Sequence, residues 1–332
     1  MKLKEIGEFG FIERFKPLFN DLIQDNQIGI GDDCAIIPAN ETEDWVITTD
    51  LLVEDVHFLR EAITPRQLGY KALAVNLSDI AAMGGKPTGS FLSIAIPSSI
   101  DVEYLDEFMA GYHELSAKYG VPLLGGDTTK SLKHLTINVC AMGKCAKGKA
   151  RRRSMAQTGD LICITGQLGD SAAGLKLLLE KSPKIAGYGY LLAKHHHPEP
   201  QIAEGMFLAD ISEVHAMMDI SDGIASDLKH ILKASRKAAT IDVNKLPVSD
   251  ILKNVAQTLD WNAEELAASG GEDYELLFTM APEHVETIQK QFAEHFRKPL
   301  YVIGQIADGE SIISWLKGDK EIELGQSGFN HF

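Results

Sequence analysis

The sequence lacks several features that would assign it at once to a class of protein. It has four cysteines and no Cys-x-x-Cys pair, so we expect neither a disulfide framework nor a cysteine-based zinc site. No apolar run approaches the ~18 residues that a membrane-spanning helix requires. Nothing at the N-terminus resembles a signal peptide. We therefore expect a cytoplasmic protein with reduced thiols and no membrane partner.

Basic residues are also scarce. The 32 Lys and Arg residues are outnumbered by 47 Asp and Glu residues, which gives a formal net charge of −15. Such a surface repels phosphate backbones, so nucleic acid is not expected as a partner. If this acidic protein handles anionic substrates, metal ions are needed to offset the charge.

The chain has the length and pattern of a two-domain protein. Its 332 residues are enough for about two domains of ~150 residues each. Strand-like and helical segments alternate in both halves, which predicts an α/β or α+β fold. We place the boundary at a basic connector, giving domains 1–146 and 147–332. We expect most of the basic side chains in this connector to be solvated, with one arginine reaching an anion as the alternative; they are Lys144, Lys147, Lys149, Arg151, Arg152 and Arg153.

The segment that ends near Asp79 predicts a buried helix with one anomalous residue. Thr64 and Pro65 are typical of a helix start, and Gly84 and Gly85 of a helix stop. The residues between them are apolar nearly all round, as in a core helix. A carboxylate there must be protonated, paired with a cation or bound to a metal.

Further carboxylates lie beside Gly, Ser or Thr in apolar contexts. They are Asp33, Asp50, Asp127, Asp219 and Asp222. A single Gly-Asp-Asp triplet, such as the one at Asp33, is more often a turn. Asp50 follows Thr48 and Thr49 at the expected end of a strand that begins at Trp45. Taken together, hard oxygen ligands favour Mg²⁺, and so many carboxylates indicate several ions that hold a polyphosphate. We interpret this as a nucleotide site without a P-loop.

Four other patterns give weaker predictions. A glycine-rich turn at residues 166–171 enters a helix and is a candidate phosphate site. His57 is by default a structural histidine, and the run from Lys194 to Pro198 is interpreted as a cap where a helix meets a loop. The N-terminal segment predicts an amphipathic docking helix from the spacing of Phe11, Phe15, Leu18 and Leu22.

The motifs, in their order along the chain, resemble the thiamine-monophosphate kinase family. This family belongs to the aminoimidazole ribonucleotide synthetase-like (PurM-like) ATP-binding superfamily. The resemblance covers essentially the whole chain, and it rests on Gly31-Asp32-Asp33, Thr48-Thr49-Asp50, Asn76-Leu-Ser-Asp79 with Gly84-Gly85, Gly125-Gly126-Asp127, Asp219-Ile-Ser221-Asp222-Gly223, Gly270-Gly271-Glu272-Asp273-Tyr274 and the terminal Gly328-Phe329-Asn-His-Phe332. It implies a two-domain α/β (α+β) fold whose N-terminal sheet pairs in a homodimer.

The resemblance also implies roles for single residues. The implied magnesium ligands are Asp33, Thr48, Thr49, Asp50, Asp79, Asp127, Asp219 and Asp222. The implied ATP contacts are Gly126, Asp127, Arg153 and Ser221, and the implied contacts with the thiamine moiety are His57, Glu272 and Phe329. Among them, catalysis is expected to depend on Asp50, Asp79, Asp127 and Arg153.

The implied activity is ATP-dependent phosphorylation of thiamine monophosphate to thiamine diphosphate, the last step of thiamine diphosphate biosynthesis. We expect direct in-line transfer assisted by Mg²⁺, with the acceptor phosphate already deprotonated. Two alternatives stay open at this point. One is another enzyme of the superfamily, of the selenophosphate, aminoimidazole ribonucleotide or hydrogenase-maturation type. The other is a non-catalytic nucleotide or metal sensor.

Overall fold

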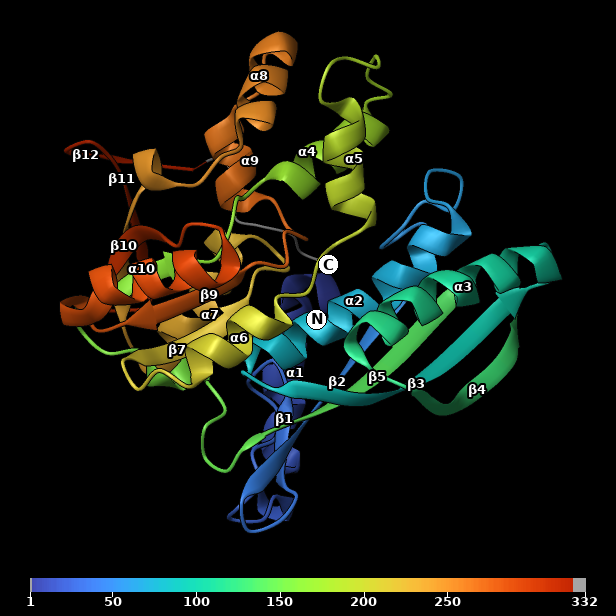
Figure 1. The fold of residues 1–332 in the computed structure, drawn as a ribbon, viewed down its shortest axis with the longest axis horizontal. Coiled ribbons are helices and arrows are strands. Elements are labelled where there is room, and N and C mark those ends of the chain that lie inside the picture. Colours follow the sequence, from blue (N-terminus) through green and yellow to red (C-terminus); the bar gives the residue numbers. More distant parts are fainter. Residues whose placement is uncertain (1, 325–332) are drawn as a thin grey trace.

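The first of two β-sheets is formed by the N-terminal half of the chain (Figure 1). The structure is a computed structural model that describes residues 2–324. In this sheet only β3 and β4 are parallel to each other. The strand order is β1 (Ala35–Pro38), β2 (Glu43–Val53), β5 (Thr136–Ala146), β3 (Lys86–Pro97) and β4 (Leu123–Ser131).

The second sheet is formed by the C-terminal half. All its neighbouring strands are antiparallel except the pair β11 and β8. The strand order is β12 (Lys320–Ile322), β11 (Ile313–Lys317), β8 (Ala238–Asp242), β10 (Tyr301–Ala307), β6 (Leu161–Ile164), β9 (Leu276–Met280) and β7 (Val214–Asp219).

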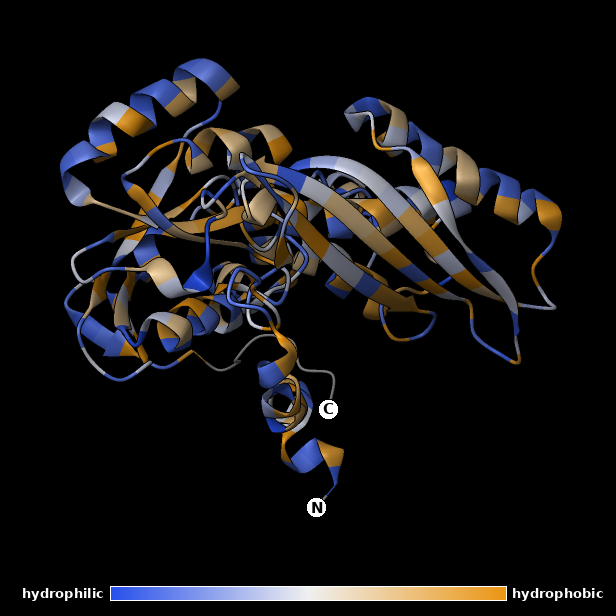
Figure 2. Cartoon of the chain, turned by 90° about the horizontal axis from the view of Figure 1, so that it is seen from below, coloured by the Kyte–Doolittle hydropathy of each residue, from blue (hydrophilic) through white to orange (hydrophobic). Residues whose placement is uncertain are grey.

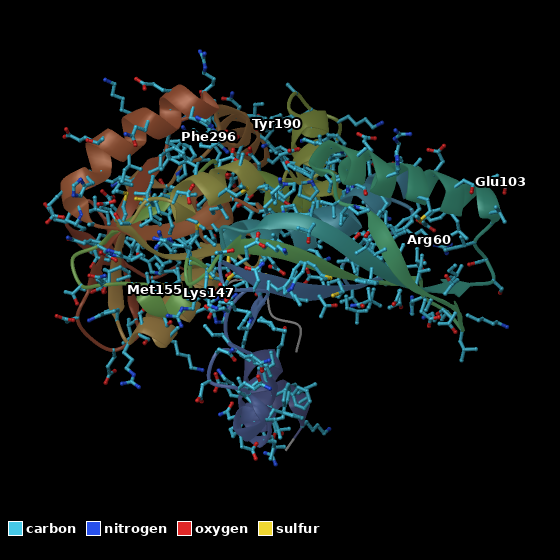
Figure 3. The ribbon with its side chains drawn as sticks, turned by 60° about the horizontal axis from the view of Figure 1, so that its bottom comes forward. Arg60, Glu103, Lys147, Met155, Tyr190 and Phe296 are labelled. Carbon is cyan, nitrogen blue, oxygen red and sulfur yellow. The ribbon has the colours of Figure 1, made fainter. Side chains whose placement is uncertain are left out.

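Helices flank both sheets, and this mixture confirms the predicted two-domain α/β (α+β) fold. They are α1 (Gly7–Phe15), α2 (Pro65–Ala82), α3 (Val102–Tyr119), α4 (Asp170–Leu179), α5 (Tyr188–His196), α6 (Ile202–Ala209), α7 (Ile224–Ser235), α8 (Asp250–Leu259), α9 (Ala263–Ser269) and α10 (Val285–Phe296). In Figure 3, Glu103 of α3 and Arg60 lie at the end of the molecule opposite Phe296 of α10.

Helix α2 is the central element of the fold. Thr64 forms a capping box with Gln67, and the predicted start of the helix is confirmed. The helix packs on α3 and the first sheet and also on α6 and β7 of the second half, so one apolar cluster joins both halves, while a second cluster lies within the C-terminal half. Every residue from Leu68 to Ala82 is buried except Asp79, which is partly exposed. The expectation of a core helix that carries one carboxylate is thus confirmed, with Asp79 at the edge of the core.

The first sheet is longer than the sequence pattern indicated. Strand β2 does not end at Asp50 but continues to Val53. Strand β4 includes the whole Gly125-Gly126-Asp127 motif. Side chains alternate along β2, so Thr48 is buried on the face covered by α2 while Leu51 is exposed on the opposite face. Figure 2 shows hydrophobic and hydrophilic residues intermixed along these strands.

The expected N-terminal docking helix is shorter than predicted. Helix α1 ends at Phe15, and two short 3-10 turns follow because Pro17 lacks the N–H group that an α-helix would use. Phe11, Leu18 and Leu22 are 50%, 71% and 71% exposed. Figure 2 shows this segment projecting from the body of the protein.

The membrane prediction can be tested on the helices. Within residues 2–324, no helix combines the length and the apolar character that crossing a bilayer requires. The four cysteines are all free thiols, as expected.

Candidate active site

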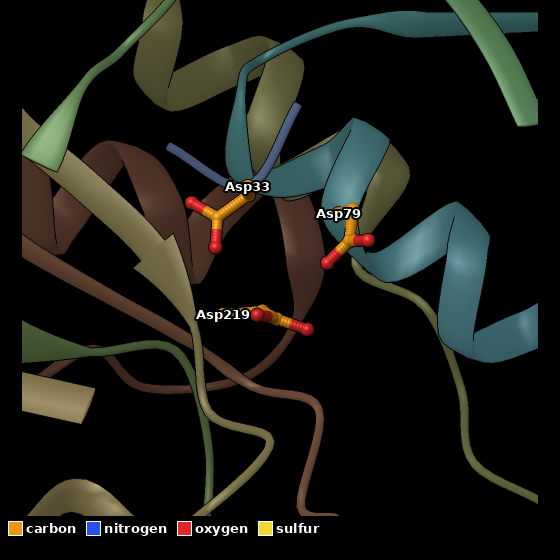
Figure 4. A group of neighbouring side chains, drawn as sticks. All are labelled: Asp33, Asp79 and Asp219. Atoms are coloured by element: carbon orange, nitrogen blue, oxygen red, sulfur yellow. The ribbon is translucent and has the colours of Figure 1, made fainter. Parts of the chain in front are cut away.

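Three carboxylates from distant parts of the chain converge where α2 meets the second sheet. Asp33 precedes β1, Asp79 lies in the last turn of α2, and Asp219 ends β7. Figure 4 shows the three side chains pointing toward one another, and one oxygen atom from each lies within 4.8 Å of the others. We call Asp33, Asp79 and Asp219 the acid cluster. It forms because α2 packs against both halves of the protein.

Polar residues next to the acid cluster fix its geometry. The Thr48 hydroxyl donates a hydrogen bond to Asp79 Oδ2 at 2.5 Å, and the Ser78 hydroxyl donates to Asp219 Oδ2 at 2.6 Å. The amide oxygen of Asn76 accepts from the backbone N–H of Asp50 at 3.1 Å. The Asn76-Leu-Ser-Asp79 motif therefore reaches both sheets, although sequence reasoning gave a site role only to its last residue.

Arg153 provides a positive charge at the acid cluster. Its guanidinium lies 2.5 Å from Asp33 Oδ1, and its backbone N–H donates to Asp32 Oδ1 at 2.8 Å. Burial disfavours the charge of Arg153, but the carboxylates of Asp33 and Asp32 outweigh burial and raise its pKa. The expectation that one arginine of the basic connector reaches an anionic site thus agrees with the geometry. Lys147 of the same connector is labelled in Figure 3.

Burial and mutual repulsion oppose ionisation of these carboxylates. Burial, followed by the charges of Asp50, Asp219 and Asp33, raises the pKa of Asp79 well above its ordinary value. Burial and the charge of Asp33 raise the pKa of Asp219 to about 8 and that of Asp50 to about 6. A cation that binds here competes with protons for the same oxygen atoms.

The acid cluster fits the requirements of Mg²⁺. Asp33 Oδ2 is buried and has no hydrogen-bond partner among the described residues, so it is an oxygen in need of a cation. All the donors are hard oxygen atoms, as Mg²⁺ prefers. Mg²⁺ usually keeps several waters and takes only one or two carboxylates directly, so oxygen atoms within 4.8 Å of one another can hold it partly through water.

The Gly-Gly-Glu-Asp-Tyr loop is bound to the segment that follows Asp219. The backbone N–H groups of Glu272 and Tyr274 donate to the carbonyl oxygens of Ser221 and Ile220 at 2.7 and 2.9 Å. A Cβ atom at Gly271 would lie 2.4 Å from Ser221 O, so only glycine permits this approach. Glu272 and Tyr274 both have left-handed backbone angles, with φ of 63° and 51°. Such conformations are costly for residues with side chains and are concentrated at functional sites.

Glu272 contacts two residues that sequence reasoning did not place in the site. Its Oε2 atom lies 3.0 Å from Lys71 Nζ of α2 and 3.0 Å from His195 Nδ1 of α5. Burial opposes the charge of Glu272, but Lys71 and His195 outweigh it and lower the pKa of the carboxyl to about 2. His195 does lie in the last turn of a helix, as the capping interpretation expected, but its ring is buried. An isolated lysine in an apolar helix is the same kind of anomaly as Asp79, and that signal could have identified Lys71.

The glycine-rich turn at residues 166–171 is not an open phosphate site. The Asp273 carboxylate accepts hydrogen bonds from the backbone N–H groups of Gly169 and Ser171 at 2.7 and 3.4 Å. The N-terminus of α4 is therefore already occupied by a carboxylate of the protein itself. The sequence-based prediction of a phosphate site here is wrong.

Two predicted metal ligands lie on the other face of the first sheet. Thr49 points away from Thr48 and Asp50, and its hydroxyl donates to Val139 O at 3.2 Å. Asp127 of β4 lies on the same face of the sheet as Thr49. Strand β4 is three strands away from β2, which corresponds to roughly 14 Å at the usual spacing between strands. The structure of a single chain thus does not bring Thr49 and Asp127 to the acid cluster.

The other predicted residues lie in strand β4, in loops or outside the described part. Gly126 allows β4 to approach β3, because a Cβ there would lie 1.7 Å from Leu92 O. Ser221 and Asp222 lie in the turn between β7 and α7. His57 follows β2, and its Nδ1 accepts from the backbone N–H of Val53 at 3.0 Å. Phe329 lies outside the described residues.

Comparisons with known proteins agree with this geometry. The family described as "AIR synthase related protein, N-terminal domain" matches residues 31–145, and its C-terminal counterpart matches residues 157–317. The thiamine-monophosphate kinase of Buchnera aphidicola subsp. Schizaphis graminum is 41% identical over 99% of both chains.

Solved structures extend this similarity to three dimensions. AaThiL complexed with AMPPCP and TMP has a TM-score of 0.85 and 33% identity, covering 100% of this chain and 99% of that one. Thiamine-monophosphate kinase from Stenotrophomonas maltophilia K279a has a TM-score of 0.76 and 36% identity, covering 92% of this chain and 96% of that one. The chain therefore belongs to the thiamine-monophosphate kinase family of the AIR synthase related proteins.

Proposed function

We propose that this protein transfers the γ-phosphoryl group of ATP to the phosphate of thiamine monophosphate, giving thiamine diphosphate and ADP. The observation that carries this proposal is the acid cluster, in a chain that matches thiamine-monophosphate kinases over its whole length. A related protein was solved with AMPPCP and TMP, which are an ATP analogue and a phosphate-bearing ligand. Two anionic reactants need a site that offsets their repulsion, and the acid cluster can hold cations for that purpose.

The residues of the acid cluster would hold Mg²⁺. We assign Asp33, Asp79 and Asp219 as its ligands, supported by Thr48, Asp50 and Asp222. When bound, Mg²⁺ neutralises phosphate charge and stabilises the charge that spreads over the transferred group. Arg153 contacts the triphosphate, together with Gly126 and Ser221. The acceptor phosphate is deprotonated near neutral pH, so no side chain has to act as a general base.

The thiamine moiety is assigned to a second group of residues. We place His57, Glu272 and Phe329 around its rings. An aromatic ring such as that of Phe329 attracts a cationic thiazolium ring through its π face. The assignment of Glu272 is supported by its fixed carboxylate and its left-handed backbone.

We also propose that the protein acts as a cytoplasmic homodimer. The face of the first sheet opposite α2 is open and carries the exposed apolar residues Leu51 and Phe91. Covering this face with a second copy would bury them and enclose Thr49 and Asp127. We further propose that the domains are 1–146 and 147–332, with the boundary at the basic connector.

The proposed activity is tested by product analysis. Purified protein is incubated with thiamine monophosphate and MgATP, and the products are separated by ion-pair chromatography. Thiamine diphosphate and ADP in equal amounts are expected. ATP consumption without thiamine diphosphate would indicate another enzyme of the superfamily, and ligand binding without turnover would indicate a sensor.

Replacing Glu272 should weaken thiamine monophosphate binding selectively. We expect Glu272→Ala to raise the KM for thiamine monophosphate at least about 10-fold, because a hydrogen bond to a charged group contributes about 1.5–3 kcal/mol. The KM for ATP should change less than about 2-fold, since Glu272 is not assigned to the nucleotide. Steady-state kinetics with each substrate varied in turn measures both constants. Phe329→Ala should behave in the same way, and equal effects on both substrates would contradict the assignment.

A further inference from the structure

We propose that Lys71 and His195 are positioning residues that hold Oε2 of Glu272, so that Oε1 is presented to the substrate as a hydrogen-bond acceptor. This inference rests on the proposed function and assigns a specific chemistry to its thiamine site. The group recognised is a neutral N–H donor, such as the exocyclic amino group of an aminopyrimidine ring. Glu272 then acts through the direction of a lone pair and not through its net charge.

Lys71 is the first of the two positioning residues. Its side chain is only 1% exposed, and its ammonium group donates to Glu272 Oε2 at 3.0 Å and to the carbonyl oxygen of His195 at 3.1 Å. A buried ammonium group requires a counter-charge, because an isolated charge in an apolar interior is strongly disfavoured. Lys71 therefore fixes the carboxylate and is itself fixed by it.

His195 is the second positioning residue. Its Nδ1 lies 3.0 Å from Glu272 Oε2 and 3.2 Å from the hydroxyl of Ser171. Burial and the charge of Lys71 lower the pKa of this imidazole, so that it is neutral near pH 7. A neutral His195 leaves one positive and one negative charge in the group, Lys71 and Glu272, which offset each other.

Part of the Glu272 side chain stays accessible to a ligand. Its side chain is 25% exposed, whereas Lys71 and His195 are almost fully buried beneath it. Within residues 2–324, both side-chain contacts of the carboxylate end on Oε2, and no hydrogen bond ends on Oε1. The left-handed backbone at Glu272 and the hydrogen bond from its N–H group to Ser221 O hold the residue from the other side. Oε1 is thus an oriented acceptor at the surface of a rigid group.

The two ways in which Glu272 could bind thiamine predict opposite effects of removing Lys71. If Glu272 attracted the cationic thiazolium ring by charge, removing the positive charge of Lys71 would strengthen that attraction and lower the KM for thiamine monophosphate. If Glu272 is a positioned acceptor, removing Lys71 releases the carboxylate and raises that KM. The sign of the change therefore separates the two mechanisms.

The test is a kinetic comparison of the wild-type protein with Lys71→Met, which keeps the length of the side chain. We expect the KM for thiamine monophosphate to rise at least 5-fold, and both kcat and the KM for ATP to stay within about 2-fold. Lys118→Met is the matched control, because Lys118 also pairs across the two halves, with Glu199, but it is half exposed and has no hydrogen bond or ion pair with Glu272 among the described residues. Lys118→Met should leave kcat and the KM values for both substrates unchanged.

A second variant keeps the inference testable if Lys71→Met does not fold. His195→Asn removes the imidazole but keeps Lys71 and the backbone carbonyl that it contacts, and it should raise the KM for thiamine monophosphate about 3-fold with the same selectivity. A lowered or unchanged KM for thiamine monophosphate in a folded variant, or equal changes in the KM values of both substrates, would overturn the proposed positioning role of Lys71 and His195. Absence of thiamine diphosphate with the wild-type protein would instead overturn the proposed function.

Discussion

Asp79→Asn should reduce kcat by about 10²-fold or more while the protein stays folded, since removing one electrostatic group from a transition-state site costs about that much. Asp79 is the member of the acid cluster that α2 supplies, and its oxygen lies within 4.8 Å of those of Asp33 and Asp219. Asparagine keeps the shape of the side chain but removes the negative charge that would hold a cation. The loss should be measured as the rate of thiamine diphosphate formation at saturating MgATP.

The thermal midpoint of the same variant checks that the loss is chemical. Without a metal, burial and three neighbouring carboxylates oppose the charge of Asp79, so neutralising it should leave Tm unchanged or raise it slightly. Asp106→Asn, on the exposed face of α3, is the matched control and should retain full activity. Near-normal turnover of Asp79→Asn at ordinary Mg²⁺ concentrations would show that Asp79 does not bridge metal and substrate.

Chelation of divalent cations should abolish turnover, and excess Mg²⁺ should restore it. The acid cluster, Asp50 and the two anionic substrates together carry a large negative charge. Among the described residues, Arg153 is the cationic side chain that contacts the cluster directly, so metal ions are needed to offset the rest. EDTA titration followed by Mg²⁺ addition measures the dependence, and K⁺ at matched ionic strength is the control. Full activity in excess EDTA would contradict the assignment of the acid cluster.

Metal binding to the acid cluster should also depend on pH in a defined direction. The pKa of Asp219 is raised to about 8 and that of Asp50 to about 6, so the folded protein without metal binds protons that the unfolded chain has released. The stability from these groups is present below pH ~4 and is lost as the pH rises through the folded-state values. Mg²⁺ competes with these protons. The rise in Tm at saturating Mg²⁺ should therefore be larger at pH 8 than at pH 6, and the reverse order would count against metal binding at these carboxylates.

Local signals in the sequence were enough to predict much of the fold. Thr64, Pro65 and the paired glycines bounded α2, and α3 likewise ends at Gly120, whose left-handed conformation is typical of a helix stop. These predictions succeeded because caps and glycines act within one turn of a helix. The extent of β2 and β4 was not predictable in this way, because strand length depends on pairing with β5 and β3, which are remote in the sequence.

Residues of the candidate site were predictable where their type was unusual for the surrounding sequence. Asp79 was identified because a carboxylate is unusual in an apolar helix. The Lys71 partner of Glu272 is 201 residues away in the sequence, so no local pattern indicated the pair. Asp273 likewise caps α4 across 104 residues. Alternation along β2 shows that Thr48 and Thr49 point to opposite faces of the sheet. It does not show which of the two faces α2, because that depends on tertiary packing.

The course of α2 has one further consequence. Asp79, which we assign to the phosphates through Mg²⁺, and Lys71, which we assign to the positioning of Glu272, lie on the same helix, eight residues and about 12 Å apart. The helix packs on elements of both halves of the protein, which fix its position. The helix therefore fixes the distance between the two proposed binding points, and under this proposal a ligand that engages both must carry its phosphate and its ring N–H donor at a matching separation.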